Sequence, residues 1–492
     1  MHRARSMTRR ACCVMPLNSG LTQVAISGIV AFSCPGFFNA LSGLGGAGSE
    51  NASANAPANV ALYVTFAVFG YFGGMFFNLY GPRVLMSCGG VTYAIYAACA
   101  YINGSGYLGS SPAAVTASKT LFVLAGALLG FGAALFWTAQ GAMMIAYAPE
   151  HRKGFYIGIF WFVFNLGGFM GGILQFVLNY RAIEADAAAQ SNALSYFVFV
   201  ATMLAGSLTA AIFVIPDPCH GKVIREDGTE IKKEEVGNKS VRQEIMDVVE
   251  GAKSKDMQLL FLLFFGTNFF LTYVFNCFNG VMFNIRTRGL NSAIYFLSQM
   301  GGASALGRLL DGGSSGKRRV RQSDLFKRAK LGFWILCVSF NLSYVLGAYV
   351  QLYYEGGYSR AVKYTNLIDF AQDSGRWVLP LLVLVLYGIS EAFVQAYSYW
   401  LLGACLAKND STLSARYTGC YKGAQSIGAA VAWALNVEEF GIEYSTQFFI
   451  GWAVFLIGLP YTWAVVQQIP FRDGGDEGDL ERDGDGVALK EA

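Results

Sequence analysis

Charged residues are scarce in this sequence: Asp, Glu, Lys and Arg make up only 14% of its 492 residues. A soluble domain carries about 25% charged residues, so a soluble fold would need several domains with almost no polar surface. The three histidines lie in the N-terminal tail and in polar loops, which excludes a relay of membrane-embedded histidines. The ten cysteines form no pair of CxxC motifs, so we expect no metal site.

Motifs for catalysis and cofactor binding are absent from the sequence as well. It contains no nucleotide-binding loop and no catalytic triad. We therefore expect no catalytic residue, no cofactor and no enzyme activity. The net charge of +4 comes from Lys and Arg residues that lie in the tail and between apolar runs. This differs from the basic patch of a nucleic-acid-binding protein, so no nucleic-acid partner is expected.

Apolar runs dominate the chain, and hydrophobic residues make up 54% of it. A transmembrane helix needs roughly 20 mostly apolar residues. The sequence therefore predicts an all-α, multi-pass membrane protein with twelve spans in a lipid bilayer. Two or three runs are rich in glycine and polar residues, which leaves eleven spans as an alternative. The twelve runs are 21–41, 60–80, 84–102, 121–148, 155–178, 194–215, 259–283, 293–310, 331–352, 378–402, 417–435 and 448–466.

Basic residues concentrate in every second loop, starting with an N-terminal tail that has four arginines and no acid. By the positive-inside rule, both termini are predicted to be cytosolic, in the plasma membrane or an endomembrane. This orientation requires an even number of spans. It also places the sequons at Asn51 and Asn103 in outward-facing loops, where we expect glycosylation.

A polar, charge-mixed segment separates the first six runs from the last six. Within it, apolar residues at helical spacing over 241–249 predict a short amphipathic helix along the inner membrane face. The predicted organisation is a cytosolic N-terminal tail (1–17), a six-helix half (18–215), a cytosolic linker (216–256), a second six-helix half (257–467) and a disordered acidic cytosolic tail (468–492).

The two halves share a motif between their second and third runs. The first copy reads GMFFNLYGPR (74–83) and the second reads GRLLDGGSSGKRR (307–319). Asn78 occupies the position that the acid Asp311 holds in the second copy. An acid at a helix end can engage cations and the N-terminus of a neighbouring helix, as in a gate; a tight turn that needs glycine is the alternative. The motif residues are Gly74, Asn78, Gly81, Arg83, Gly307, Arg308 and Asp311.

These motifs, with the six-plus-six layout, resemble the major facilitator superfamily. Two further segments, FWTAQGAMMIAYAPEHRKG (136–154) and RYTGCYKGAQSIGAAVAW (416–433), are similar to its Unc-ninety-three-like (uncoordinated) branch. The resemblance runs from Leu17 to Ile469 and implies twelve helices in two halves about a pseudo-twofold axis. Some members of that branch resemble transporters, while others regulate channels or escort receptors. The resemblance therefore implies the fold more closely than the activity.

Glu391 is the only carboxylate inside the apolar middle of a run. An ionised group there costs several kcal/mol unless it is paired, solvated or protonated. Lys422 lies about two turns inside the eleventh run and is the expected counter-charge. We interpret Glu391 as a coupling group with Lys422 as its partner. A purely structural ion pair is the main alternative, and a position at the lipid interface is another.

Further polar residues inside the runs are candidates for a substrate cavity, although hydrogen bonds between helices would also explain them. The leading interpretation is a transporter that moves a small solute by alternating access, with proton coupling through Glu391. The alternative is a regulator or escort that binds a client membrane protein, which the missing acid at Asn78 suggests. The candidate cavity residues are Gln140, Asn165, Asn276, Asn279, Gln395 and Gln425.

Overall fold

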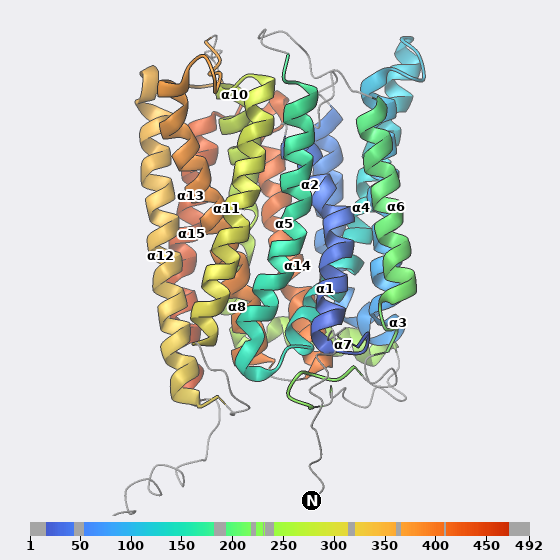
Figure 1. Ribbon diagram of the computed structural model, residues 1–492, viewed down its shortest axis with the longest axis vertical. Coiled ribbons are helices and arrows are strands. Elements are labelled where there is room, and N and C mark those ends of the chain that lie inside the picture. The colour runs from blue at the N-terminus through green and yellow to red at the C-terminus, as the bar shows by residue number, and fades with distance from the viewer. Residues whose placement is uncertain are drawn as a thin grey trace, which may run out of the picture.

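The computed structural model is a bundle of long helices that run roughly along one axis (Figure 1). It describes residues 16–43, 54–181, 193–217, 223–229, 231, 241–312, 320–360, 366–407 and 410–471. The predictions for the tails fall almost entirely outside these ranges, as does most of the linker before residue 241. Within these ranges the only β structure is two isolated bridges, so the fold is all-α as predicted.

The first half contains a helix that covers two of the predicted spans. Helix α3 has 51 residues and bends at Gly81, where φ is 74° and ψ is 168°. Glycine adopts this conformation at little cost, and Pro82 after it has no backbone N–H. The predicted loop between runs 60–80 and 84–102 is therefore a very short break at Gly81, where the two helical parts of α3 meet. The helices of this half are α1 (Gly20–Ala31), α2 (Phe37–Gly43), α3 (Asn55–Ser105), α4 (Pro112–Ala146), α5 (Lys153–Leu178) and α6 (Ala193–Phe213).

The second half repeats the pattern after the linker helix α7 (Val241–Lys253). Nine helices in the described ranges are long and apolar enough to cross a membrane. Helix α3 is long enough for two spans, and the more polar α11 and α14 complete the twelve helices of the bundle. The helices of this half are α8 (Lys255–Gly266), α9 (Phe269–Thr272), α10 (Gly280–Met282), α11 (Ile285–Asp311), α12 (Gln322–Leu352), α13 (Ser374–Trp400), α14 (Ser411–Leu435) and α15 (Tyr444–Gln468).

The first helical span of each half contains a π-helical segment. Segment η1 (Phe32–Gly36) joins α1 to α2 and contains Pro35, and η5 (Tyr273–Asn279) joins α9 to α10. A π-helical turn holds one more residue than an α-helical turn and is frequent at functional sites. Residues inside or just after both segments line the cavities at the centre of the bundle.

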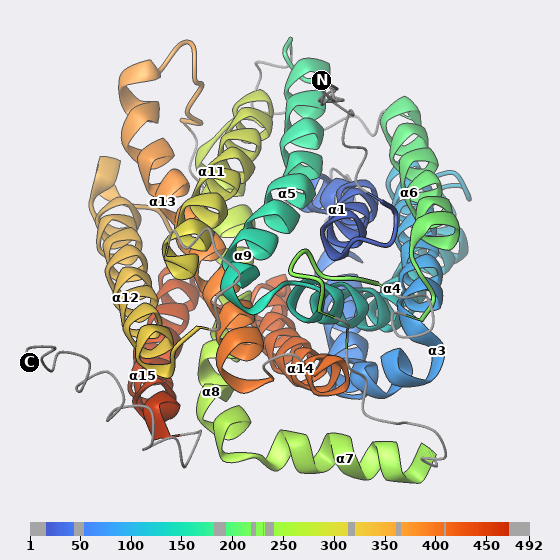
Figure 2. The same ribbon diagram turned by 60° about the horizontal axis from the view of Figure 1, so that its bottom comes forward.

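Two helix pairs, α5 with α11 and α3 with α14, join the halves. Figure 2 shows α5 beside α11, and α14 beside α3 and α4. Small residues allow the backbones to approach closely: Gly154 packs against Gly307, and a Cβ on Gly172 would lie 2.7 Å from the Ala293 nitrogen. On the other pair, a Cβ on Gly74 would lie 2.7 Å from Cα of Arg416.

A buried ion pair closes the end of the α5–α11 pair that lies away from α7. Arg286 donates to Asp369 through Nε (2.6 Å) and Nη2 (2.7 Å), and its Nη1 donates to the Tyr180 carbonyl across the junction. Burial alone would raise the pKa of Asp369, but hydrogen bonds from Arg286 and Asn284 hold it well below its usual range. Asp369 is therefore ionised and fixes the loop before α13 to the start of α11.

Candidate functional site

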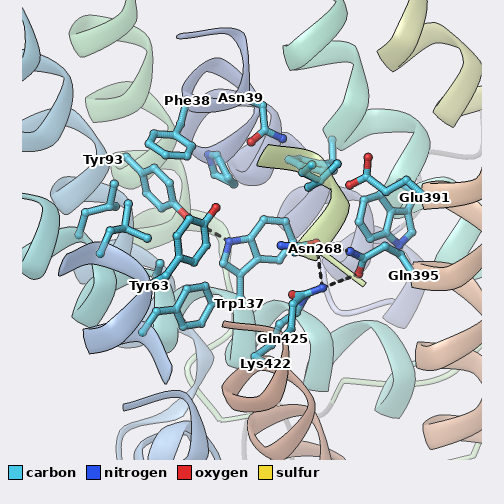
Figure 3. A pocket seen from close by; sticks show the side chains of 18 residues that line it. Phe38, Asn39, Tyr63, Tyr93, Trp137, Asn268, Glu391, Gln395, Lys422 and Gln425 are labelled. Atoms are coloured by element: carbon cyan, nitrogen blue, oxygen red, sulfur yellow. Dashed lines mark hydrogen bonds between the residues drawn. The ribbon is translucent and has the colours of Figure 1, made fainter. Parts of the chain in front are cut away.

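A cavity lies between the halves near the middle of the bundle. The first half contributes mainly aromatic rings, and the second half contributes most of its polar groups. Figure 3 shows Tyr63 and Tyr93 on one side and Glu391 and Gln395 on the other, with Trp137 between them. The aromatic wall consists of Phe38, Tyr63, Phe66, Tyr93, Trp137, Trp161 and Phe164. The polar wall consists of Asn268, Glu391, Gln395, Lys422 and Gln425.

A second chamber adjoins this cavity. The two share Phe38, Asn39, Tyr63, Leu271 and Glu391, so Glu391 lies where they meet. The second chamber adds Thr272, Phe275, Asn276, Phe296 and Trp433.

Glu391 is held by neutral donors from α11. Its Oε2 accepts hydrogen bonds from the Tyr295 hydroxyl (2.5 Å) and from Gln299 Nε2 (2.7 Å). Tyr295 and Gln299 lie one turn apart on α11, so they project from the same face. Only 7% of Glu391 is exposed. The carboxyl group therefore links α13 to the helix that packs against α5.

Lys422 is held by a different set of groups. Its Nζ donates to Gln425 Oε1 (2.8 Å) and lies 4.8, 5.1 and 4.6 Å from the ring centres of Trp137, Tyr399 and Tyr421. Rings at this distance stabilise a cation through their π faces. Among the described residues no ion pair joins Lys422 to Glu391. The predicted direct pair is thus not formed here, although both residues line the same cavity.

A network of amides connects Lys422 to α13 and to the start of the second half. Gln425 Nε2 donates to Thr267 Oγ1 (2.7 Å) and Asn268 Oδ1 (3.1 Å), and Gln395 Nε2 donates to the same Asn268 oxygen (2.8 Å). The Tyr421 hydroxyl donates to Gln395. Asn268 lies in the break between α8 and α9, which leaves its side chain free to join helices α13 and α14.

Three of the six predicted cavity residues line the two chambers: Gln395, Gln425 and Asn276. The other three do not. Asn279 bonds to Asn291 and to the Arg288 carbonyl within the second half, and Gln140 contacts Met144 one turn away. Asn165 is buried in α5. These three residues lie on helix faces that pack against other helices. A single polar residue in an apolar run does not indicate which way its helix face points.

The second copy of the repeated motif contacts the other half directly. Asp311 accepts hydrogen bonds from the backbone nitrogens of Gly154 (2.8 Å) and Phe155 (2.6 Å), at the N-terminus of α5. Gly307 permits the close approach, while Arg308 is exposed. A carboxylate is favourable there because the first N–H groups of a helix lack internal partners.

The first copy of the motif is connected differently. Asn78 Nδ2 donates to Glu244 Oε2 of α7 (3.4 Å), and Glu244 pairs with Arg416 of α14 (3.2 Å). Gly81 forms the kink of α3, and Arg83 Nε donates to the Val214 carbonyl at the end of α6 (2.5 Å). The linker helix therefore provides a carboxylate beside the position where the motif lacks one.

The predicted glycosylation sites have different environments. Asn51 lies outside the described residues. Asn103 is 1% exposed in the last turns of α3 and accepts a hydrogen bond from Ser118 Oγ (3.2 Å). A glycan on Asn103 requires this end of α3 to open, and its glycosylation stays a prediction.

Sequence reasoning missed several residues of the site. Tyr295, Gln299, Asn268 and Tyr63 were not singled out, and Glu244 was treated only as part of a polar linker. The one available signal was the pair of polar residues spaced four apart in the eighth run, 295 and 299, which lie on one helix face.

Comparisons with known proteins agree with this architecture. The family model described as "Major Facilitator Superfamily" matches residues 24–433. UNC93-like protein 1 of Arabidopsis thaliana is 36% identical over 461 residues, covering 94% of this chain and 93% of the relative. An UNC93-like protein of Schizosaccharomyces pombe is 32% identical over 456 residues, covering 91% of this chain and 83% of the relative.

Solved structures of similar fold are more distant in sequence. A bacterial homologue of the iron transporter ferroportin, in an outward-facing state, has a TM-score of 0.60 at 9% identity, covering 92% of this chain and 100% of that chain. The E. coli fucose:proton symporter FucP has a TM-score of 0.56 at 12% identity, covering 90% of this chain and 98% of the symporter.

Proposed function

Because the chain belongs to the UNC93-like branch of the major facilitator superfamily, we propose that it is a transporter that moves a small amphipathic organic solute. Transport proceeds by alternating access between halves that comprise residues 18–215 and 257–467. Both termini face the cytosol, and the membrane is the plasma membrane or an endomembrane. The chain acts without a cofactor and is not an enzyme.

The asymmetry of the central cavity is the observation that carries this proposal. Its aromatic wall suits the apolar or ring face of a solute, and its polar wall offers both a carboxyl group and an ammonium group. Two lining donors, Trp161 Nε1 and Asn276 Nδ2, are buried without a hydrogen-bond partner in the described part of the chain. Unpaired buried donors are costly, and a polar group on a bound solute would satisfy them.

Glu391 is the group proposed to couple protons to the solute. Protonation of its carboxyl group removes acceptor capacity, which weakens the bonds from Tyr295 and Gln299. Both donors are on α11, which packs along α5 of the other half. Protonation or deprotonation of Glu391 therefore alters the contact between α13 and α11. This contact lies next to the α5–α11 junction between the two halves. Lys422, which lines the same cavity as Glu391, orients the bound solute.

The test is transport by the purified full-length chain in liposomes, with solutes supplied in pools and a pH-sensitive dye inside. We expect a solute-dependent proton flux in the wild type that Glu391→Gln abolishes. Lys422→Gln should weaken apparent solute affinity. Glu439→Gln is the matched control, because Glu439 is exposed outside the cavity, and it should transport normally. Equal flux in Glu391→Gln and wild type would refute the coupling role.

The same variant separates the transporter from an escort. An escort should tolerate Glu391→Gln and co-purify with a client membrane protein, and its wild type should move no solute. Two observations motivate the escort interpretation: the missing acid at Asn78 and the mixed activities of the UNC93-like branch. Since Glu244 contacts Asn78, the first motive is weaker, and transport is the function we favour.

A further inference from the structure

Linker helix α7 buries an acid against the bundle. Glu244 is fully buried, and its carboxylate lies 3.2 Å from Nη2 of Arg416 and 3.4 Å from Nδ2 of Asn78. Asp247, one turn further along α7, lies 2.7 Å from the same Arg416 nitrogen. Helix α7 therefore bridges α3 of one half and α14 of the other through charged and polar contacts.

The apolar residues of α7 differ in exposure: Val248 is buried against the bundle, and Met246, 60% exposed, lies between the basic and the polar residues. Three others are exposed along one flank. Val241 is 55% exposed, Ile245 38% and Val249 41%. Their spacing of four residues places them along one flank of the helix. Gln243 and Glu250 are exposed on the opposite flank, and Arg242 and Lys253 lie near the border between the two. Viewed along its axis, the helix has a bundle-facing side, an apolar flank with a basic border, and a polar flank.

A phospholipid surface is the occupant that fits the apolar flank. Only Ser254 separates α7 from α8, which begins a membrane-spanning segment, so α7 lies at the level where a span begins. Asn78, which α7 contacts, is followed by Leu79 and Tyr80, exposed by 37% and 59% just before the break of α3 at Gly81. Figure 2 shows α7 lying across this end of the bundle beside α8. Amphipathic helices with basic borders lie in the plane of the lipid interface.

We propose that α7 is a lipid-anchored latch: its apolar flank docks in an anionic phospholipid interface, and Glu244 of the docked helix holds α3 and α14 together. Arg242 and Lys253 meet the anionic headgroups. The helix provides the carboxylate beside position 78 only while it lies on the membrane. This proposal does not depend on which solute, if any, the chain transports.

The first test measures the environment of α7 in nanodiscs that contain phosphatidylcholine with phosphatidylglycerol. Site-specific spin labels are placed at 245 and 249 on the apolar flank, and at 243 and 250 as matched controls. The labels at 245 and 249 should be more accessible to oxygen than to a water-soluble nickel chelate, and those at 243 and 250 should show the inverse order. The same order at all four positions overturns the proposal.

The second test measures the latch itself, as the distance between labels at Tyr80 on α3 and Leu413 on α14. Glu244→Gln should lengthen this distance in every lipid. Ile245→Glu should lengthen it as well, whereas Gln243→Glu, which adds the same charge on the polar flank, should not. Omitting phosphatidylglycerol should lengthen it in the wild type. If Glu244→Gln lengthens the distance and Ile245→Glu does not, the helix latches without the membrane and the proposal fails.

Discussion

The two junctions between the halves use similar packing but different chemistry. Glycines bring α5 against α11 and α3 against α14. At the first junction the acid belongs to the helix itself, because Asp311 of α11 accepts two backbone hydrogen bonds from the start of α5. At the second junction the acid comes from α7, through Glu244. The two junctions therefore share close glycine contacts but not the residues that secure them.

This difference has a physical consequence. The Asp311 contact joins two membrane helices directly, so it persists as long as those helices are in register. The Glu244 contact depends on a third helix, α7, which belongs to the linker. Events at α7 therefore bear directly on the α3–α14 junction.

The largest expected effect at the second junction follows from removing its cation. Arg416→Gln leaves the buried Glu244 without a positive partner, and breaking a buried pair in this way costs about 3–5 kcal/mol. Thermal unfolding of the protein in nanodiscs that contain phosphatidylcholine with phosphatidylglycerol measures the loss. Arg321→Gln is the control, because that arginine is 79% exposed in its pair with Asp324 and should change stability by about 1 kcal/mol or less. Equal losses would mean that Glu244 is not held by Arg416.

Packing at the first junction can be broken by a side chain. Gly307→Val places a Cβ against the carbonyl oxygen of Gly154, and such overpacking costs about 1–3 kcal/mol. Gly301 is on the same helix with no atom near its Cβ position, so Gly301→Val should leave the unfolding midpoint nearly unchanged. If both variants unfold at the same temperature, helix propensity and not the contact between the halves explains the loss.

Restoring the acid that the motif lacks should destabilise this chain. Asn78→Asp replaces the donor to Glu244 with a second carboxylate at about the same place, and like charges this close repel. We expect a loss of about 1–2 kcal/mol, within the range for coupled neighbouring residues. Glu244→Gln in the same chain should recover most of it. A stabilising Asn78→Asp would show that Glu244 does not take over the role of the missing acid.

Acid should loosen the far end of the α5–α11 junction. The pKa of Asp369 is lower in the folded protein than its unfolded value of 3.8. The ionised carboxylate therefore makes its full contribution to folding stability at pH values above 3.8. This contribution is lost as the pH falls below that value toward the lower folded pKa. The expected loss by pH 3 is about 1 kcal/mol, read from unfolding midpoints between pH 6 and pH 3. Asp369→Asn should start from a lower stability and lack this part of the acid dependence.

The sequence predicted the twelve-helix fold because apolar runs and loop composition are local properties. Glu391 could be found for a related reason: a carboxylate in an apolar run is expensive wherever the run is placed. Its partners could not be found, since Tyr295 and Gln299 come from another helix and nothing local indicates which face meets α13. The direct Glu391–Lys422 pair was an inference from charge alone, and the rings around Lys422 offer the cation another environment.

The role of Glu244 was beyond sequence reasoning for a different reason. An acid in a polar linker does not stand out in the sequence, because its neighbours are also charged and nothing indicates that it is buried. Its burial arises only when α7 lies against α3 and α14. Whether Gln140, Asn165 and Asn279 face a cavity was beyond sequence reasoning in a similar way, since it depends on the rotation of each helix about its long axis.

The π-helical segments η1 and η5 make the cavity sensitive to chain length as well as to residue identity. Each contains one residue more than an α-helix needs for the same turn, and Asn39 comes after η1 while Asn276 lies inside η5. Deleting a single residue from either segment would restore α-helical winding and leave the downstream helix in nearly the same rotational phase, because the wider turn already absorbs the extra residue. Such a one-codon deletion would move Asn276, which lies inside η5, relative to its chamber, whereas Asn39, which follows η1, would keep its orientation.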